Sequence, residues 1–128
     1  MKSSRGFTVV ELLIVVAFLA AASIIFFIQK NNIEVAARDD ARKTSINAMH
    51  YSLEEVYFKE HKSYPRTLSA ETLPSVDPEL FKDPNGVKIG ESTSNFRYEP
   101  TECNGDSCKS YSLRTILENE ADYIKKNR

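Results

Sequence analysis

Residues 5–28 read RGFTVVELLIVVAFLAAASIIFFI, and this N-terminal stretch decides the fold. A short basic peptide gives way to an apolar run between Gly6 and Phe7. The apolar run, residues 7–28, has roughly the ~20 residues that a helix needs to cross a bilayer. It contains one ionisable side chain, Glu11, and a charge inside such a segment costs about 2.5–3.5 kcal/mol even on lenient insertion scales. Glu11 is therefore the first candidate functional residue, and we expect it to have a cationic partner.

The residues around this junction, Arg5-Gly6-Phe7-Thr8-Val9-Val10-Glu11-Leu12, resemble the processing signal of the type IV pilin and type II secretion pseudopilin family. That signal combines a short basic leader, a glycine, an apolar first residue and a glutamate at the fifth mature position, directly ahead of a membrane helix. The chain has all of these features. The resemblance implies that a prepilin peptidase cuts after Gly6 and methylates the new amine of Phe7.

The resemblance also implies an organisation for the whole chain. It divides the chain into a leader (1–6), a transmembrane and assembly helix (7–28) and an extracytoplasmic domain (29–128). The implied fold is α+β, with a long N-terminal helix, half transmembrane and half amphipathic, packed on a small antiparallel β-sheet. The implied partners are the peptidase/methyltransferase, identical or related subunits, a pilus assembly platform and the membrane. The precursor would sit in the inner (cytoplasmic) membrane, and the mature subunit in an extracellular fibre.

The chemistry of the segment agrees with this resemblance. Cleavage after Gly6 creates an ammonium group at Phe7, and methylation keeps its positive charge. Opposite charges that are buried together compensate each other's desolvation. In a packed array of such helices, the Phe7 amine of one subunit could pair with Glu11 of its neighbour, and a buried polar contact of this kind can fix axial register.

Two other interpretations of the N-terminus compete with processing at Gly6. In the first, residues 7–19 are the apolar region of an ordinary secretory signal that is cut at the small residues 20–22, so that the mature chain starts at Ser23. That cut would leave an apolar pentad at the mature N-terminus, with no benefit to a secreted domain. In the second, the segment is an uncleaved anchor, and Glu11 extends toward the lipid headgroups. This interpretation leaves the Gly6-Phe7 junction unexplained.

Length and charge bound the rest of the chain. With 128 residues, the protein has room for one small domain besides the membrane segment. The net charge is −1, and without Lys2 and Arg5 it becomes −3, with 15 basic against 18 acidic side chains. This balance argues against a strongly basic nucleic-acid surface, although nucleic-acid binding itself stays open. The basic residues ahead of Phe7 place that end of the segment in the cytoplasm, so the domain should face an oxidising compartment.

The sequence predicts an unusually long helix. Residues 7–63 contain neither glycine nor proline, and Tyr64-Pro65 supplies the first stop signal. Past residue 30, apolar side chains recur at helical spacing and predict a face that packs on the sheet. This face comprises Val35, Ile46, Met49, Leu53, Val56 and Tyr57. The weakly apolar opposite side suits either contact with other subunits or an ordinary solvated surface, and comprises Ile33, Ala37, Ala41 and Ala48.

The connector, residues 63–90, contains four prolines that forbid long regular elements. We expect a short helix around residues 68–73 and a short strand at 87–89. The Asp83-Pro84-Asn85-Gly86 turn partly resembles the calcium turn of major pseudopilins. Its oxygen donors are of the kind that calcium prefers: Asp77, Glu79, Asp83 and Asn85. Turns that bind no metal are commoner, so the sequence predicts neither a metal nor a cofactor.

The last third of the chain predicts a hairpin. When Cys103 is set opposite Cys108, Tyr98 faces Leu113, Phe96 faces Thr115 and Pro100 faces Tyr111, so the apolar side chains share one face. The residues between the cysteines favour a turn, and a structural disulfide would close it. A redox motif or a zinc site would need a different spacing or more ligands. Residues 122–124 are either a last strand or a tail.

The sequence offers little for catalysis. His50 and His61 lie on or at the end of the predicted long helix, and no motif pairs either with a nucleophile. The chain is therefore expected to be a substrate of enzymes and not an enzyme. The favoured function is a structural subunit of a type IV pilus for motility, adhesion or DNA uptake, because the cysteine pair is typical of pilins. The alternatives are a pseudopilin of a type II secretion system and an anchored binding domain that does not polymerise.

Overall fold

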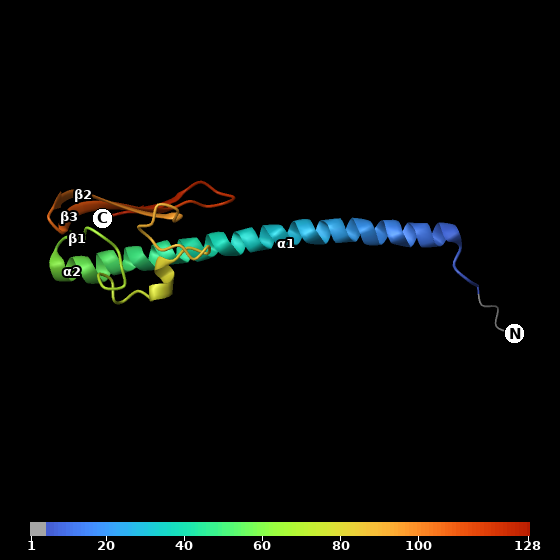
Figure 1. Ribbon diagram of the computed structural model, residues 1–128, viewed down its shortest axis with the longest axis horizontal. Coiled ribbons are helices and arrows are strands. Elements are labelled where there is room, and N and C mark those ends of the chain that lie inside the picture. The colour runs from blue at the N-terminus through green and yellow to red at the C-terminus, as the bar shows by residue number, and fades with distance from the viewer. Residues whose placement is uncertain (1–4) are drawn as a thin grey trace. The chain divides into compact units, whose positions relative to one another are not determined.

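The computed structural model describes residues 5–128, so Lys2 and most of the predicted leader lie outside the described residues. The fold is α+β, as predicted, with one long N-terminal helix and a four-stranded antiparallel sheet (Figure 1). Contacts within the chain define two compact units, one up to Val35 and the other Ala36–Arg128. The sheet, the connector and the second half of the helix belong to the second unit.

The long helix begins as α1 (Val9–Tyr51) and continues through a π-helical turn, η1 (Ser52–Tyr57), into α2 (Phe58–His61). It ends at Lys62, whose φ of 57° places it in the left-handed region that commonly closes a helix. The predicted length is therefore confirmed. The absence of glycine and proline explains it, because neither residue type is present to break the helix before Lys62.

The π-helical turn shifts the phase of the helix at its C-terminal end. Three consecutive residues, 52–54, are buried there, since a π-turn bonds i to i+5 and rotates the residues that follow. Val56 was predicted to lie in the core but is 39% exposed, so that prediction is wrong. Ala48 was assigned to the opposite face, yet it is partly buried against the core. Tyr57 is also partly buried, as predicted.

The sheet is built around one central strand. The strands are β1 (Tyr64–Pro65), β2 (Phe96–Asn104), β3 (Ser107–Thr115) and β4 (Tyr123–Lys126). Strand β3 pairs with β2 along one side and with β1 and β4 along the other, always antiparallel. The predicted register is confirmed at Cys103 opposite Cys108 and at the three apolar pairs that follow from it. Of the two alternatives for residues 122–124, the strand is the one observed, as β4.

The connector between β1 and β2 departs from the prediction in two places. Residues 68–73 form turns instead of a short helix, although the amide of Leu73 does donate to the carbonyl of Ser69 at 3.0 Å. Residues 87–89 contribute one bridge, between Lys82 and Lys88, instead of a strand. The regular element here is a 3-10 helix, η2 (Pro78–Phe81). Closely spaced prolines remove the amide donors that longer elements would need.

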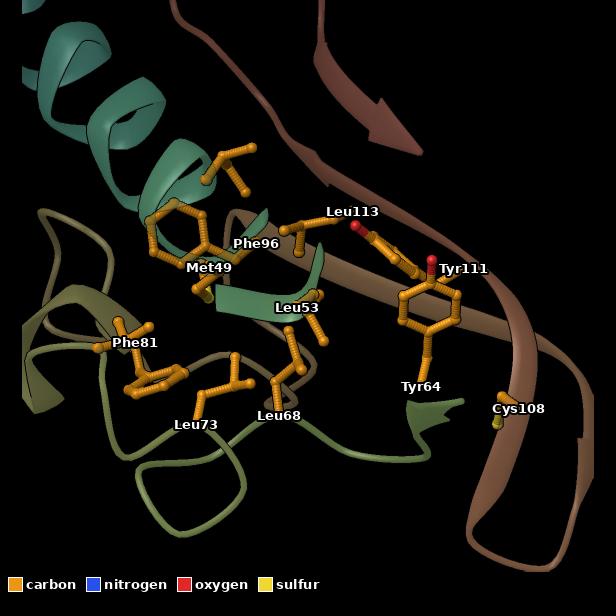
Figure 2. Packing of buried hydrophobic residues seen from close by; sticks show 12 residues of the cluster. Met49, Leu53, Tyr64, Leu68, Leu73, Phe81, Phe96, Cys108, Tyr111 and Leu113 are labelled. Carbon is orange, nitrogen blue, oxygen red and sulfur yellow. The ribbon is translucent and has the colours of Figure 1, made fainter. Parts of the chain in front are cut away.

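The core joins the helix, the sheet and the connector (Figure 2). Met49 and Leu53 of the helix have no exposed surface and face Phe96 and Leu113 of the sheet. The connector closes the core from the other side with apolar side chains that include Leu68, Leu73 and Phe81. This packing gives the amphipathic half of the helix the apolar partner that its periodicity predicted.

Candidate functional site

Glu11 lies in the first turn of α1 and takes part in a capping box. The hydroxyl of Thr8 accepts a hydrogen bond from the amide of Glu11 at 3.2 Å, and Oε2 of Glu11 accepts one from the amide of Thr8 at 3.3 Å. Because α1 begins at Val9, Thr8 is the N-cap and Glu11 the third helical residue, which is the spacing of this motif. An acidic side chain in this position also interacts favourably with the helix dipole. The local sequence therefore explains where the helix starts.

The expected cationic partner of Glu11 does not come from the part of the chain that the structure describes. Within residues 5–128, the hydrogen bonds of the Glu11 carboxylate run to Thr8, from its amide and from its hydroxyl at 3.5 Å. Phe7, the residue that would carry the new amine, precedes the cap and is 79% exposed. Glu11 thus has a neutral partner in the uncut chain and remains accessible to another molecule.

The apolar run of α1 is exposed along its whole length. Every side chain from residue 7 to residue 28 is exposed. By length and composition the helix can cross a membrane, since its most apolar 18-residue window has a mean hydropathy of 2.8. Soluble monomers rarely expose apolar patches larger than a few hundred Å². This surface needs lipid or other helices around it.

The two cysteines are bonded to each other, as predicted. The disulfide joins β2 to β3 next to the tip of their hairpin, where Gly105 has a φ of +62°. Arg66, just after β1, donates to the carbonyl of Gly105 at 2.9 Å. The hairpin tip is thus held covalently at its base and by one hydrogen bond at its turn.

A charged network that the sequence analysis missed ties α1 to the segment after β3. Asp39 and Arg42 are buried and lie 2.8 Å apart, Oδ1 to Nη1. The carboxylate of Asp39 accepts hydrogen bonds from the backbone amides of Glu118 and Asn119 at 3.0–3.2 Å. Glu118 in turn binds Arg42 at 3.0 Å and Arg38 at 2.8 Å. The signal was available, because Asp39 and Arg42 fall in helical phase with Ile46, Met49 and Leu53.

The network lowers the pKa of both carboxyl groups. Hydrogen bonds from Arg38 and Arg42 lower the pKa of Glu118 from 4.5 to about 2. Burial alone would raise the pKa of Asp39, but the backbone hydrogen bonds from Glu118 and Asn119 and the contact with Arg42 outweigh it, so this pKa is lowered. Both groups are therefore ionised at neutral pH, and the network is an ionic clamp.

A second missed cluster surrounds Glu54 on the π-helical turn. Its carboxylate is buried and accepts hydrogen bonds from the hydroxyls of Tyr111 at 2.8 Å and Tyr64 at 3.2 Å. Burial and then the charge of Glu54 raise the pKa of Tyr64 to about 12, and burial also raises the pKa of Tyr111. The two rings pack edge to face, with centroids 4.7 Å apart (Figure 2). The cluster joins η1, β1 and β3. These hydrogen bonds hold Glu54, and with it the π-helical turn, against the sheet.

Three of the four candidate calcium donors, Asp77, Glu79 and Asp83, have side chains that make other contacts. The carboxylate of Asp83 accepts three backbone hydrogen bonds, from the amides of Asn85, Val87 and Asn95. Asp77 caps η2, and Glu79 pairs with Lys82 at 3.1 Å. Among residues 5–128 there is no group of three His, Cys, Asp or Glu side chains that could hold a metal ion.

Both histidines make local contacts. The Nε2 atom of His50 lies 3.0 Å from the carbonyl oxygen of Lys126 on β4. His61 stacks on the ring of Tyr57, with centroids 4.1 Å apart, and its Nδ1 atom lies 3.2 Å from the carbonyl of that residue. These contacts account for the two side chains as parts of the fold.

Searches with the chain against protein-family models, curated proteins and solved structures find no match.

Proposed function

We propose that this chain is a prepilin, a structural subunit that is cut after Gly6, methylated at Phe7 and polymerised into a helical type IV pilus. The observation that carries the proposal is one charged side chain, Glu11, in the first turn of an exposed apolar helix, four residues after a leader-like junction. In an anchor that only holds a domain at the membrane, a neutral glutamine could complete the capping box equally well. A subunit that must align with identical helices needs the charge, which attracts the amine of a neighbour.

Glu11 has a role at each stage of the proposed assembly. Before assembly, the amide and hydroxyl of Thr8 satisfy the carboxylate, which reduces the cost of holding it near the bilayer. Cleavage after Gly6 creates a cation one residue ahead of the cap. During assembly, the amine of a neighbouring subunit approaches the exposed carboxylate and compensates its charge in a low-dielectric environment.

The second unit of the chain supports the same function. Its core, disulfide and ionic clamp stabilise a small domain carried by the second half of the helix. In the proposed fibre, this domain forms the outer surface, and motility, adhesion and DNA uptake are all compatible with it. The disulfide hairpin favours a pilin over the alternative, a pseudopilin of a type II secretion system.

Mass analysis of the mature N-terminus tests the proposal. We expect the protein isolated from cells to begin at Phe7 with a methylated amine. A chain that begins at Ser23 would establish an ordinary secretory signal, and an uncut chain that begins at Met1 would establish an anchor.

A Gly6→Val variant supplies the control. No atom lies within 4 Å of a Cβ added at Gly6, so the substitution leaves the fold undisturbed. We expect this variant to reach the membrane, remain uncut and form no fibres.

A further inference from the structure

The chain contains two Asn-Gly pairs, Asn85-Gly86 in the connector and Asn104-Gly105 at the tip of the β2–β3 hairpin. An asparagine before glycine is the pair in which the following backbone nitrogen reaches the side-chain amide carbon most easily, because glycine has no Cβ to obstruct it. All four residues are exposed, so sequence and exposure alone predict equal reactivity. The structure shows that the backbone is held differently in the two pairs.

The backbone around Asn85-Gly86 is fixed by Asp83. The amide of Gly86, which would be the nucleophile, donates to the carbonyl of Asp83 at 2.8 Å. The amides of Asn85 and Val87 both donate to Oδ1 of Asp83, at 2.9 and 3.1 Å. Asp83 itself is buried. Three hydrogen bonds must therefore break before this backbone can rotate into a reactive geometry.

The backbone at Asn104-Gly105 is less restrained. Among residues 5–128, the amide of Gly105 has no acceptor within hydrogen-bonding distance. Within these residues, Gly105 is held only through its carbonyl oxygen, which accepts a hydrogen bond from Arg66. Asn104 and Ser107 are the ladder pair next to the turn, beside the disulfide pair Cys103–Cys108, and Gly105 itself lies in the turn outside the ladder. In the described part of the chain, the reacting nitrogen is therefore free of the kind of hydrogen bond that holds the Gly86 amide.

We infer that Asn104 is a site of spontaneous modification, in which its side-chain amide is lost and the backbone is rearranged. The Gly105 nitrogen loses its proton to solvent and forms a bond to Cγ of Asn104, while the bond from Cγ to the side-chain nitrogen breaks and ammonia leaves. Water then opens the resulting five-membered imide. Opening at Cγ gives aspartate, and opening at the backbone carbonyl gives isoaspartate. One water is consumed, one ammonia is released, and no oxidation or reduction occurs.

The product changes the hairpin tip in two ways. It adds a negative charge next to the disulfide, and in the isoaspartate form it adds a methylene group to the backbone. The second change breaks the register of Asn104 opposite Ser107 and displaces the Gly105 carbonyl from Arg66. In a long-lived extracellular protein, this modified tip accumulates with age.

Peptide mapping of the full-length protein in detergent, incubated at mildly alkaline pH, tests the inference. The conversion at each asparagine is followed by mass, and isoaspartate by its separate chromatographic peak. We expect Asn104 to convert several-fold faster than Asn85 in the native protein. In the reduced, denatured chain, where the contacts of Asp83 are lost, the two rates should become nearly equal.

An Asp83→Ala variant sharpens the comparison. It should accelerate conversion at Asn85 and leave the rate at Asn104 unchanged, and an Asn104→Gln variant should block the reaction at the hairpin while keeping a polar side chain. If Asp83→Ala does not fold, the inference is still tested by comparing conversion at Asn104 and Asn85 in the native and in the denatured wild-type protein. Conversion at Asn85 as fast as at Asn104 in the native protein would overturn the inference. The inference would also be overturned if Asn104 stayed intact in the native protein while it converted in the denatured chain.

Discussion

The two halves of the long helix share one secondary structure and differ in where they find a partner. Residues 7–28 expose every side chain, although nearly all of them are apolar. In the second half, Ile46, Met49 and Leu53 have no exposed surface, because the sheet and the connector cover them. A helix that is apolar on all sides needs a partner outside its own domain, whereas an amphipathic one packs within it. The first half is therefore built for an environment that the chain alone does not supply.

The acidic side chains of the two halves repeat this difference. Asp39 is buried against the segment between β3 and β4, and Glu54 is buried against tyrosines of the sheet. Glu11, by contrast, is exposed and bonded to neutral groups of the adjacent Thr8. The carboxylate of Glu11 is therefore accessible to a cation from another molecule, and the proposed assembly depends on such a contact.

The two halves of the helix should differ most in the loss of stability when one leucine from each half is replaced by alanine. Leu53→Ala removes a fully buried side chain, and such changes lower the free energy of unfolding by about 2–5 kcal/mol. Leu13→Ala removes a side chain that is 63% exposed and should change it by less than about 0.5 kcal/mol. Chemical denaturation of the full chain in detergent, followed by near-UV circular dichroism, measures both. Similar losses for the two variants would contradict the division of the helix.

The ionic clamp gives the next effect. Asp39→Ala leaves Arg42 buried with Glu118 as its remaining anion. Breaking a buried ion pair lowers the free energy of unfolding by about 3–5 kcal/mol. Because Glu118 still compensates part of the charge, we expect a loss near the lower end of this range. Asp40→Ala, at the exposed neighbouring position, is the matched control and should change stability by less than about 0.5 kcal/mol. Equal effects in the same denaturation assay would mean that the clamp contributes nothing specific.

The clamp should also make stability depend on pH. The folded-state pKa of Glu118 is about 2, against an ordinary 4.5, and the pKa of Asp39 is also lowered. Groups whose pKa is lowered by folding stabilise the fold fully above their ordinary pKa and lose this contribution as the pH falls through the folded value. The free energy of unfolding should therefore fall between about pH 4.5 and pH 2, with a shallower slope in Asp39→Ala. A wild-type curve that stays flat in this range would contradict the assignment.

The disulfide should have a smaller effect. It closes a short loop, so replacing Cys103 and Cys108 with alanine should cost about 2 kcal/mol or less and loosen the hairpin without unfolding the domain. Hydrogen exchange should show faster exchange at the amides of β2 and β3 near the turn and unchanged exchange in the buried part of α1. Two free thiols in the extracellular protein would show that the bond does not form in the cell.

The sequence predicted those parts of the fold in which a local pattern decides the outcome. The long helix followed from the absence of glycine and proline, and the hairpin register followed from the cysteines and the alternation of Phe96, Tyr98 and Leu113. The π-turn was not predictable from periodicity, because it depends on tertiary contacts of Glu54 with two tyrosines distant in the sequence. It moved Val56 out of the core.

The charged clamp was missed for a different reason. Asp39 and Arg42 lie on the buried side of the helix, where charged residues are rare unless they are paired. Their helical phase with Ile46 was the sign that a pair existed. Of the candidate assembly site, the sequence predicted Glu11 but not its cap, although the Thr8-x-x-Glu11 spacing is that of a capping box.

The most direct test of the account is the fibre yield of a Glu11→Gln variant. Glutamine can still complete the capping box, so this change removes the charge and keeps the helix start, and it eases insertion by roughly the 2.5–3.5 kcal/mol that the charge costs. Glu34→Gln, which removes an exposed acid from the same helix, is the matched control. Fibres sheared from cells with equal membrane levels of each protein give the answer. The account predicts normal processing at Phe7, abundant fibres from wild type and Glu34→Gln, and few from Glu11→Gln, whereas equal yields from all three would contradict it.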